Sequence, residues 1–86
     1  MSVKVIKFSA SWCNPCKSMT KQLESIETYK EVQEVDIDTE IDEVKKYSIR
    51  GIPCLVAVDA NGEVSRLQGS KSASELQEWF DMVYAS

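Results

Sequence analysis

Two cysteines separated by two residues provide the clearest chemistry in this sequence. Cys13 and Cys16 flank Asn14 and Pro15 within the run Ser11–Lys17, between a β-like stretch and a helical one. At the start of a helix, two sulfurs at this spacing can close a disulfide, with Cα atoms about 5–6 Å apart. Free backbone N–H groups and the helix dipole favour a thiolate at the first cysteine. Because the thiolate is the form that attacks disulfides, the run predicts reversible thiol–disulfide exchange.

The composition limits the other kinds of chemistry that the chain could perform. Its 86 residues are expected to form a single domain, residues 1–86, of ordinary soluble composition. The chain has no histidine, which removes the usual general base and the commonest zinc ligand. We therefore expect no metal and no other cofactor. A formal charge of −4 gives no reason to expect nucleic acid or an anionic membrane as a partner.

The cysteine count and the N-terminal residues indicate the cellular compartment of the protein. Three cysteines are an odd number, which argues against a secreted disulfide scaffold and for a reactive pair plus one spare thiol. No apolar run approaches the roughly 18 residues of a membrane span. The start Met1–Lys4 also lacks the long apolar core of a signal peptide. We therefore expect a cytoplasmic protein.

The flanking sequence predicts the elements that position the cysteine pair. Val3–Phe8 is short, apolar and rich in β-branched residues, which is typical of a buried strand. A helix is expected from about Cys13 to Thr28, and its inner face carries apolar residues at spacings of four and three: Met19, Leu23 and Ile26. Val32–Ile37 alternates apolar and charged residues and predicts a second strand. Asp38 or Thr39 is then expected to cap a short helix that ends at about Tyr47.

The C-terminal half predicts a hairpin and a last helix. Pro53–Val58 is a near-continuous apolar run, and the Asn-Gly pair within Asp59–Gly62 turns the chain into a fourth strand, Glu63–Leu67. Ser72–Glu75 is a capping box that opens a helix with four apolar residues on its core face: Leu76, Trp79, Phe80 and Val83. The order β-α-β-α-β-β-α predicts an α/β fold with three helices on a four-stranded mixed sheet, since a crossover gives a parallel pair and a hairpin an antiparallel one.

Several motifs together resemble the thioredoxin family. Trp12–Lys17, Arg50–Pro53, Asn61–Val64 and Gly69 match its residue types in order and spacing, over nearly the whole chain. The resemblance implies the minimal thioredoxin fold, in a compact member of the thioredoxin/glutaredoxin superfamily that lacks the first strand and helix of a usual thioredoxin.

The resemblance also implies a role for each matching position. Cys13 would be the exposed nucleophile, Cys16 the more buried resolving cysteine, and Trp12 the indole that shields them. Pro53 would be a cis-proline that faces the cysteines. The other positions implied in substrate binding are Asn14, Pro15, Gly51, Ile52 and Gly69.

The activity implied is that of a protein disulfide reductase. Reduced Cys13 would attack a substrate disulfide, and Cys16 would resolve the mixed disulfide. The expected partners are disulfide-containing proteins and thioredoxin reductase or an equivalent electron donor, with the chain acting as a monomer. Two alternatives are open: a glutaredoxin-like reductase that uses glutathione, and a redox-independent docking subunit of a larger enzyme.

Lys7 and Glu34 depart from the family pattern. Lys7 stands where the family has a buried aspartate that relays protons to the resolving cysteine, and Glu34 stands where it has the lysine that partners this aspartate. We predict a reversed ion pair beneath Cys16, in which Glu34 or a neutral Lys7 handles the proton. The ammonium would also favour the Cys16 thiolate. The alternative is that both side chains extend into water.

Asn14 and Cys54 are two further departures, at positions where the family has glycine and threonine. Asn14 is either a neutral variant at an exposed turn or a residue that alters the reduction potential. Cys54 is either a small buried residue at the start of a strand or a third thiol within reach of the active pair, as a redox partner or part of a metal site.

Overall fold

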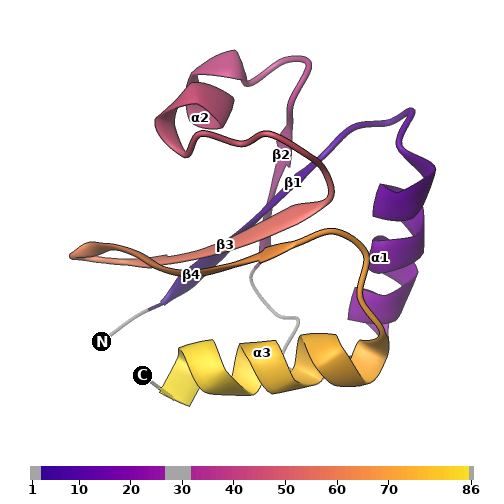
Figure 1. Cartoon of the computed structure of the whole chain (residues 1–86), viewed down its shortest axis with the longest axis vertical. Coiled ribbons are helices and arrows are strands. Elements are labelled where there is room, and N and C mark those ends of the chain that lie inside the picture. Colours follow the sequence, from indigo (N-terminus) through magenta and orange to yellow (C-terminus); the bar gives the residue numbers. More distant parts are fainter. Residues whose placement is uncertain (1–2, 27–31, 86) are drawn as a thin grey trace.

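A computed structural model describes residues 3–26 and 32–85, and it has the order of elements that the sequence predicts (Figure 1). The described elements are, in chain order, β1 (Lys4–Ser9), α1 (Asn14–Glu24), β2 (Val32–Asp36), α2 (Ile41–Lys46), β3 (Cys54–Asp59), β4 (Gly62–Gln68) and α3 (Ala73–Ala85). The strand boundaries agree with the predicted ones to within one residue. Among the described residues, no helix is long and apolar enough to cross a membrane.

The strands within the described residues form one four-stranded mixed sheet in the order β2-β1-β3-β4. β1 pairs in parallel with β2 and antiparallel with β3, which in turn pairs antiparallel with β4. The predicted α/β fold is therefore confirmed. The β3–β4 hairpin turns at Asn61-Gly62, where Gly62 has φ +121°, a backbone conformation that only glycine adopts easily.

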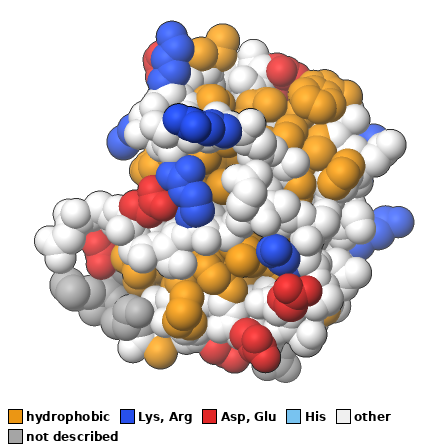
Figure 2. Space-filling model, viewed as in Figure 1, with side chains coloured by type: hydrophobic (Ala, Val, Ile, Leu, Met, Phe, Trp, Pro, Cys, Tyr) orange, Lys and Arg blue, Asp and Glu red, His pale blue; other side chains and the backbone are white. Residues whose placement is uncertain are grey.

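Side chains of β1 alternate between the two faces of the sheet. Val5 packs against residues of α1 and α3 on one face, whereas Ile6 and Phe8 pack near α2 on the other. Lys7 points to the same face as Val5, because its Nζ reaches a side chain of α1. Trp79 and Phe80 of α3 are buried as predicted. Figure 2 shows charged side chains of both signs spread over the visible face of the molecule, with apolar side chains between the sheet and α3.

The observed α1 is shorter than the predicted helix. Cys13 has an extended backbone and is the N-cap residue, so the helix begins at Asn14. It ends at Glu24, where the backbone N–H groups of Ser25 and Ile26 turn back to the carbonyls of Gln22 (3.3 Å) and Leu23 (3.0 Å). Ile26 is buried beyond the helix end. The predicted end, Thr28, lies outside the described residues.

The predicted cap of α2 is wrong. The N-cap residue is Glu40, whose carboxylate accepts a hydrogen bond from the Asp36 N–H (3.2 Å) rather than capping the helix. Asp38 does not cap, because its carboxylate accepts a hydrogen bond from the Trp12 indole. The backbone N–H of Thr39 turns back to the Asp36 carbonyl (3.2 Å).

The capping box of α3 is confirmed. The Glu75 backbone N–H donates to the Ser72 hydroxyl (3.3 Å), and the Ser72 backbone N–H donates to the Glu75 carboxylate (3.3 Å). The Ser72 hydroxyl also donates to the Glu75 carboxylate (3.0 Å), and the two hydrogen bonds from Ser72 to this carboxylate hold the pKa of Glu75 below its usual range.

Candidate redox site

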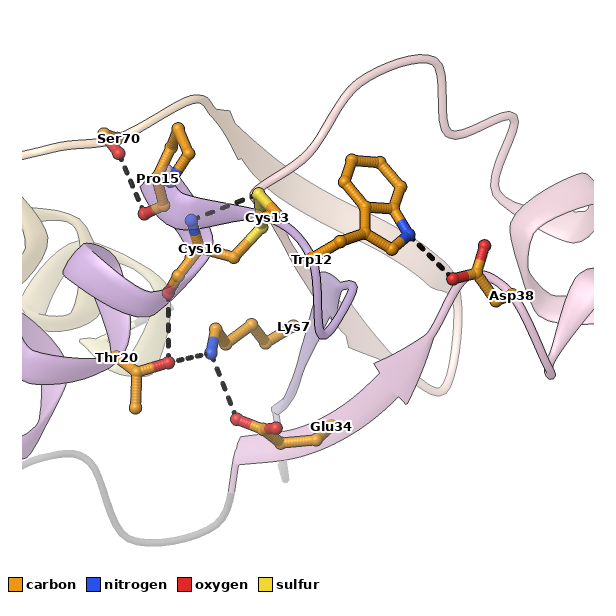
Figure 3. The surroundings of a disulfide bond; sticks show 9 residues. All are labelled: Lys7, Trp12, Cys13, Pro15, Cys16, Thr20, Glu34, Asp38 and Ser70. Carbon is orange, nitrogen blue, oxygen red and sulfur yellow. Dashed lines mark hydrogen bonds and ion pairs between the residues drawn. A yellow bond between two sulfur atoms is a disulfide. The ribbon is translucent and has the colours of Figure 1, made fainter.

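Cys13 and Cys16 form a disulfide at the N-terminus of α1, with their Cα atoms 5.3 Å apart (Figure 3). As N-cap residue, Cys13 accepts a hydrogen bond at its Sγ from the Cys16 backbone N–H (3.2 Å). Pro15 fits the first turn because its missing N–H would have no partner within the helix. The predicted geometry, a dithiol at a helix start, is therefore present.

The two cysteines are almost equally buried in this disulfide form. Cys13 is 5% exposed and Cys16 is 2% exposed. The expectation of an exposed Cys13 is wrong here, because both cysteines pack with Ala10 and are covered by Ile37 and Ile52. Each cysteine therefore presents only a small part of its surface to an attacking thiol.

The loop that precedes β3 lies against this pair. Ile52–Pro53 is a cis peptide bond, as predicted, and the Ile52 side chain packs against the cysteines. Gly69 is held beside this loop, since its backbone N–H donates to the Pro53 carbonyl (2.8 Å). It has φ +86°, a conformation that disfavours any side chain. A Cβ on Gly51 would lie 2.9 Å from the Gln68 Nε2 atom, the end of a flexible side chain.

Trp12 is anchored by Asp38, which the sequence suggested only as a helix cap. Its side chain is 63% exposed, and its indole N–H donates to the Asp38 carboxylate (2.8 Å; Figure 3). Asp38 lies just beyond β2, and Trp12 lies beyond β1, the strand parallel to it. Because the carboxyl ends of parallel strands meet at one edge of a sheet, the strand order contained the signal for this contact.

A second contact joins the helix start to the segment after β4. The Ser70 hydroxyl donates to the Pro15 carbonyl (3.1 Å). Sequence reasoning missed Ser70, which is far from Pro15 in the chain and has no motif of its own. Asn14 and Pro15 are exposed beside it.

The predicted Lys7–Glu34 ion pair is confirmed. The two residues are direct partners in the parallel β1–β2 register, and the Lys7 Nζ lies 3.1 Å from a Glu34 carboxylate oxygen. The alternative, with both side chains in water, is wrong for Lys7, which is 2% exposed; Glu34 is 55% exposed. The proton-handling role of this pair stays a prediction.

Thr20 connects this ion pair to the resolving cysteine and was also missed. The Lys7 Nζ donates to the Thr20 hydroxyl, which donates to the Cys16 backbone carbonyl (3.1 Å). Thr20 lies one helical turn after Cys16, so its position on α1 was the available signal. Lys7, Thr20 and Glu34 line a cavity of about 270 Å³ together with Cys16 and Lys17.

Cys54 is a small buried residue, as one of the two interpretations predicts. It is fully buried, and burial raises the pKa of its thiol. It belongs to the cluster of Ile6, Phe8, Val35 and Val56, not to the cluster that contains the disulfide. In the part of the chain that the structure describes, no three His, Cys, Asp or Glu residues are placed to hold a metal ion.

Comparisons with known proteins agree with this geometry. The sequence model of the Thioredoxin family matches residues 2–82. A thioredoxin of Buchnera aphidicola is 34% identical over 82 residues, which cover 91% of this chain and 75% of that relative. One of Chlamydia trachomatis is 35% identical over 75 residues, 84% of this chain and 74% of that relative.

Solved structures show the same arrangement. The thioredoxin of Malassezia sympodialis superposes with a TM-score of 0.82 at 27% identity, covering 94% of this chain and 74% of the other. The thioredoxin of Fasciola hepatica gives a TM-score of 0.82 at 27% identity, covering 94% of this chain and 80% of the other.

Proposed function

This chain belongs to the thioredoxin family, and we propose that Cys13 is the nucleophile of its reaction and Cys16 the resolving thiol. The chain is a thiol–disulfide oxidoreductase that reduces disulfides through its Cys-x-x-Cys pair. The observation that supports this division is the N-cap position of Cys13. A thiolate there would accept the Cys16 N–H as a charge-assisted hydrogen bond and would gain from the helix dipole.

The reaction balances in two exchanges. The Cys13 thiolate attacks one sulfur of the substrate disulfide, and the other substrate sulfur leaves as a thiolate that takes up a proton. The Cys16 thiolate then attacks the Cys13 sulfur of the mixed disulfide and releases the second substrate thiol. Two electrons have passed to the substrate, and the Cys13–Cys16 disulfide has formed.

We assign substrate binding to the surface around the disulfide. Ile52 would offer its backbone to an extended substrate segment, beside the cis-proline Pro53. Gly51 and Gly69 would let the partner chain approach, and the open space within 4 Å of where a Gly69 Cβ would lie supports this assignment. Trp12, Asn14 and Pro15 would form the opposite rim, where their exposure makes them available for contact.

The partners and the setting of this reaction are also part of the proposal. We propose that protein disulfides are the substrates and that thioredoxin reductase, or an equivalent dithiol donor, returns the electrons. We further propose that the chain acts as one thioredoxin domain, as a monomer in the cytoplasm, where thiols are kept reduced.

Trapping the intermediate tests the roles of the two cysteines. With a disulfide-bonded protein such as insulin as substrate, Cys16→Ser should accumulate a mixed disulfide through Cys13, visible by mass spectrometry of non-reduced protein. Cys13→Ser should form no such adduct and should not reduce the substrate. Active Cys13→Ser protein would overturn the assignment.

The electron donor separates this proposal from its alternatives. Turnover of the wild-type chain should depend on thioredoxin reductase and NADPH, and glutathione with its reductase should support it poorly. The opposite preference would favour the glutaredoxin-like alternative. Retention of cellular function by a Cys13→Ser/Cys16→Ser double variant would favour the docking subunit.

A further inference from the structure

A buried positive charge lies beside the resolving cysteine. Lys7 is 2% exposed, and its side chain lines the same cavity as Cys16 (Figure 3). Its Nζ is fixed from two sides, by the Glu34 carboxylate on β2 and by the Thr20 hydroxyl on α1. Thr20 in turn donates to the Cys16 carbonyl, so the ammonium is tied to the helix turn that carries the resolving sulfur.

We propose that the Lys7 ammonium, held in place by Thr20, stabilises the Cys16 thiolate and thereby raises the reduction potential of the dithiol. The proposal rests on the proposed function, because it takes Cys16 as the resolving thiol. Lys7 is a positioning residue in this scheme, and it acts through its charge without touching the substrate.

The contacts of Lys7 favour a role through charge over a role as proton acceptor. The Lys7 Nζ donates to both of its partners, and an ammonium has no lone pair with which to accept a proton. Glu34 is 55% exposed, and among the described residues its hydrogen-bonded connection to Cys16 runs through Lys7 and Thr20. A buried charge is screened much less than an exposed one, so the Lys7 ammonium can act on the sulfur across the cavity.

The other ionisable groups near Cys16 are few among the described residues. Lys17 lines the cavity from the exposed side of α1, and Glu34 lines it from β2. Cys54 of β3 is buried in the neighbouring cluster, where its raised pKa keeps it neutral. Lys7 is the buried charge of this set, and we expect it to dominate the electrostatic potential at Cys16.

The Cys16 thiolate can exist in the reduced protein only, and this determines how Lys7 affects the reaction. Cys16 loses its proton to water, and the thiolate attacks the Cys13 sulfur while the bond from Cys13 to the substrate breaks. The reduced dithiol can carry this thiolate, whereas the disulfide cannot. Stabilising the thiolate therefore favours the reduced state, which makes the potential less negative. It also speeds resolution near neutral pH, because more Cys16 is already deprotonated.

The main test replaces Lys7 with an uncharged residue of similar length. Lys7→Met should lower the potential, measured by equilibration with glutathione buffers and alkylation, by about 30 mV, a tenfold change in the equilibrium constant. In a Cys13→Ser background, the pH at which half of Cys16 reacts with iodoacetamide should rise by about one unit, read out for each cysteine by mass spectrometry. Lys7→Arg, which keeps the charge, should restore both values toward wild type.

A matched pair at Thr20 keeps the proposal testable if Lys7→Met does not fold. Thr20→Val keeps the shape but removes both hydrogen bonds, and Thr20→Ser keeps the hydroxyl. Thr20→Val should move the potential and the Cys16 alkylation profile in the direction of Lys7→Met, and Thr20→Ser should match wild type. Equal values for the two Thr20 variants, or for a folded Lys7→Met and wild type, would overturn the proposal.

Failure of the proposal about Lys7 can be distinguished from failure of the proposed function. Both readouts need only glutathione and an alkylating agent, so they can be measured whether or not the chain reduces protein disulfides. Unchanged values in a variant that still reduces insulin would contradict the role of Lys7 alone. Loss of insulin reduction in wild type, with the expected shifts in Lys7→Met, would contradict the proposed function alone.

Discussion

At the scale of single residues, each sulfur of the pair has its own source of positive potential. Cys13 takes the N-cap position, where a side chain normally accepts a backbone N–H near the helix start. That donor is the N–H of Cys16 itself, so the cap and the reactive sulfur are the same group. Cys16 lines a cavity together with Lys7, whose ammonium is the buried charge beside it. The two thiolates proposed for the reaction would thus be stabilised independently.

Some contacts at this scale could be paired from the sequence alone, whereas for others the sequence provided only a general indication of position. Lys7 and Glu34 could be paired because parallel strands have a fixed register, so counting from known motifs places them side by side. Thr20 and Asp38 could not be selected in this way. Each has several possible partners in sequence, and packing between separate elements decides which one it meets.

Cys54 gives a test of a buried thiol outside the reaction. Cys54→Ser should keep disulfide reductase activity, because the residue lies in a separate cluster from the active pair. It should lower the free energy of unfolding by about 1–3 kcal/mol, because a hydroxyl replaces sulfur in an apolar, fully buried site. Urea unfolding and the insulin assay provide the two measurements.

Cys54→Ala serves as the control for that substitution. It removes the sulfur without burying a hydroxyl. It also removes the contribution of the Cys54 thiol to the pH dependence of stability. Since burial raises the pKa of the Cys54 thiol, part of the wild-type free energy of unfolding should be lost as pH rises through that folded-state pKa. Cys54→Ala should lose less free energy of unfolding over the same pH range. Loss of turnover in both variants would show that the thiol takes part in the reaction.

At the scale of elements, the sequence predicted the position of an element reliably where the signal comes from neighbouring residues. Short apolar runs, one alternating segment and the Asn-Gly turn located the strands, and the capping box located the start of α3. The end of α1 was not predictable, because Ile26 continues the helical spacing and is buried although the helix has ended at Glu24. The start of α2 was misjudged because Asp38, a strong capping residue, is bound to Trp12.

The capping box of α3 allows a test of one element by itself. Ser72→Ala should lower the free energy of unfolding at pH 7 by about 1 kcal/mol, because it removes the N-cap acceptor of the Glu75 N–H. The hydrogen bonds from Ser72 also hold the pKa of Glu75 down, so they contribute stability at neutral pH that is lost as pH falls through that pKa. Urea unfolding at pH 7 and at mildly acidic pH measures both effects.

Ser72→Thr provides the matched control, since threonine keeps the hydroxyl that caps the helix. Ser72→Thr should retain most of the free energy of unfolding, and this free energy should decrease toward acidic pH as it does in wild type. Ser72→Ala should show a smaller fall over the same range, because the backbone N–H of residue 72 is then the remaining donor to Glu75. An identical pH dependence in the two variants would contradict the contribution of the serine hydroxyl.

At the scale of the whole molecule, the redox site is part of a small core. The chain has 86 residues, and the described Cα atoms have a radius of gyration of 12.1 Å. The buried residues form one cluster on each face of the sheet and a third around the disulfide. Ile37 and Ile52 pack against both the disulfide cluster and the cluster beneath α2. A change in redox state is therefore expected to change the stability of the fold.

Reduction and unfolding form a closed thermodynamic cycle. The difference in unfolding free energy between the oxidised and reduced proteins therefore equals the difference in reduction free energy between the folded and unfolded dithiols. The four-residue ring of the disulfide should give the oxidised protein an advantage of about 2 kcal/mol from chain entropy. Stabilisation of the reduced folded state by Lys7 opposes this advantage, and in an unfolded chain Lys7 has no fixed place near Cys16.

Lys7→Met should therefore widen the stability gap between the oxidised and reduced proteins. A 30 mV fall in the folded-state potential corresponds to about 1.4 kcal/mol for two electrons, so the gap should grow by that amount. Urea unfolding of both redox states, with a phosphine to maintain reduction, measures it, and Thr20→Ser is the control that should keep the wild-type gap. Because this measurement contains no glutathione equilibrium, it checks the potential independently. A gap that Lys7→Met leaves unchanged would contradict an action of Lys7 on the folded dithiol.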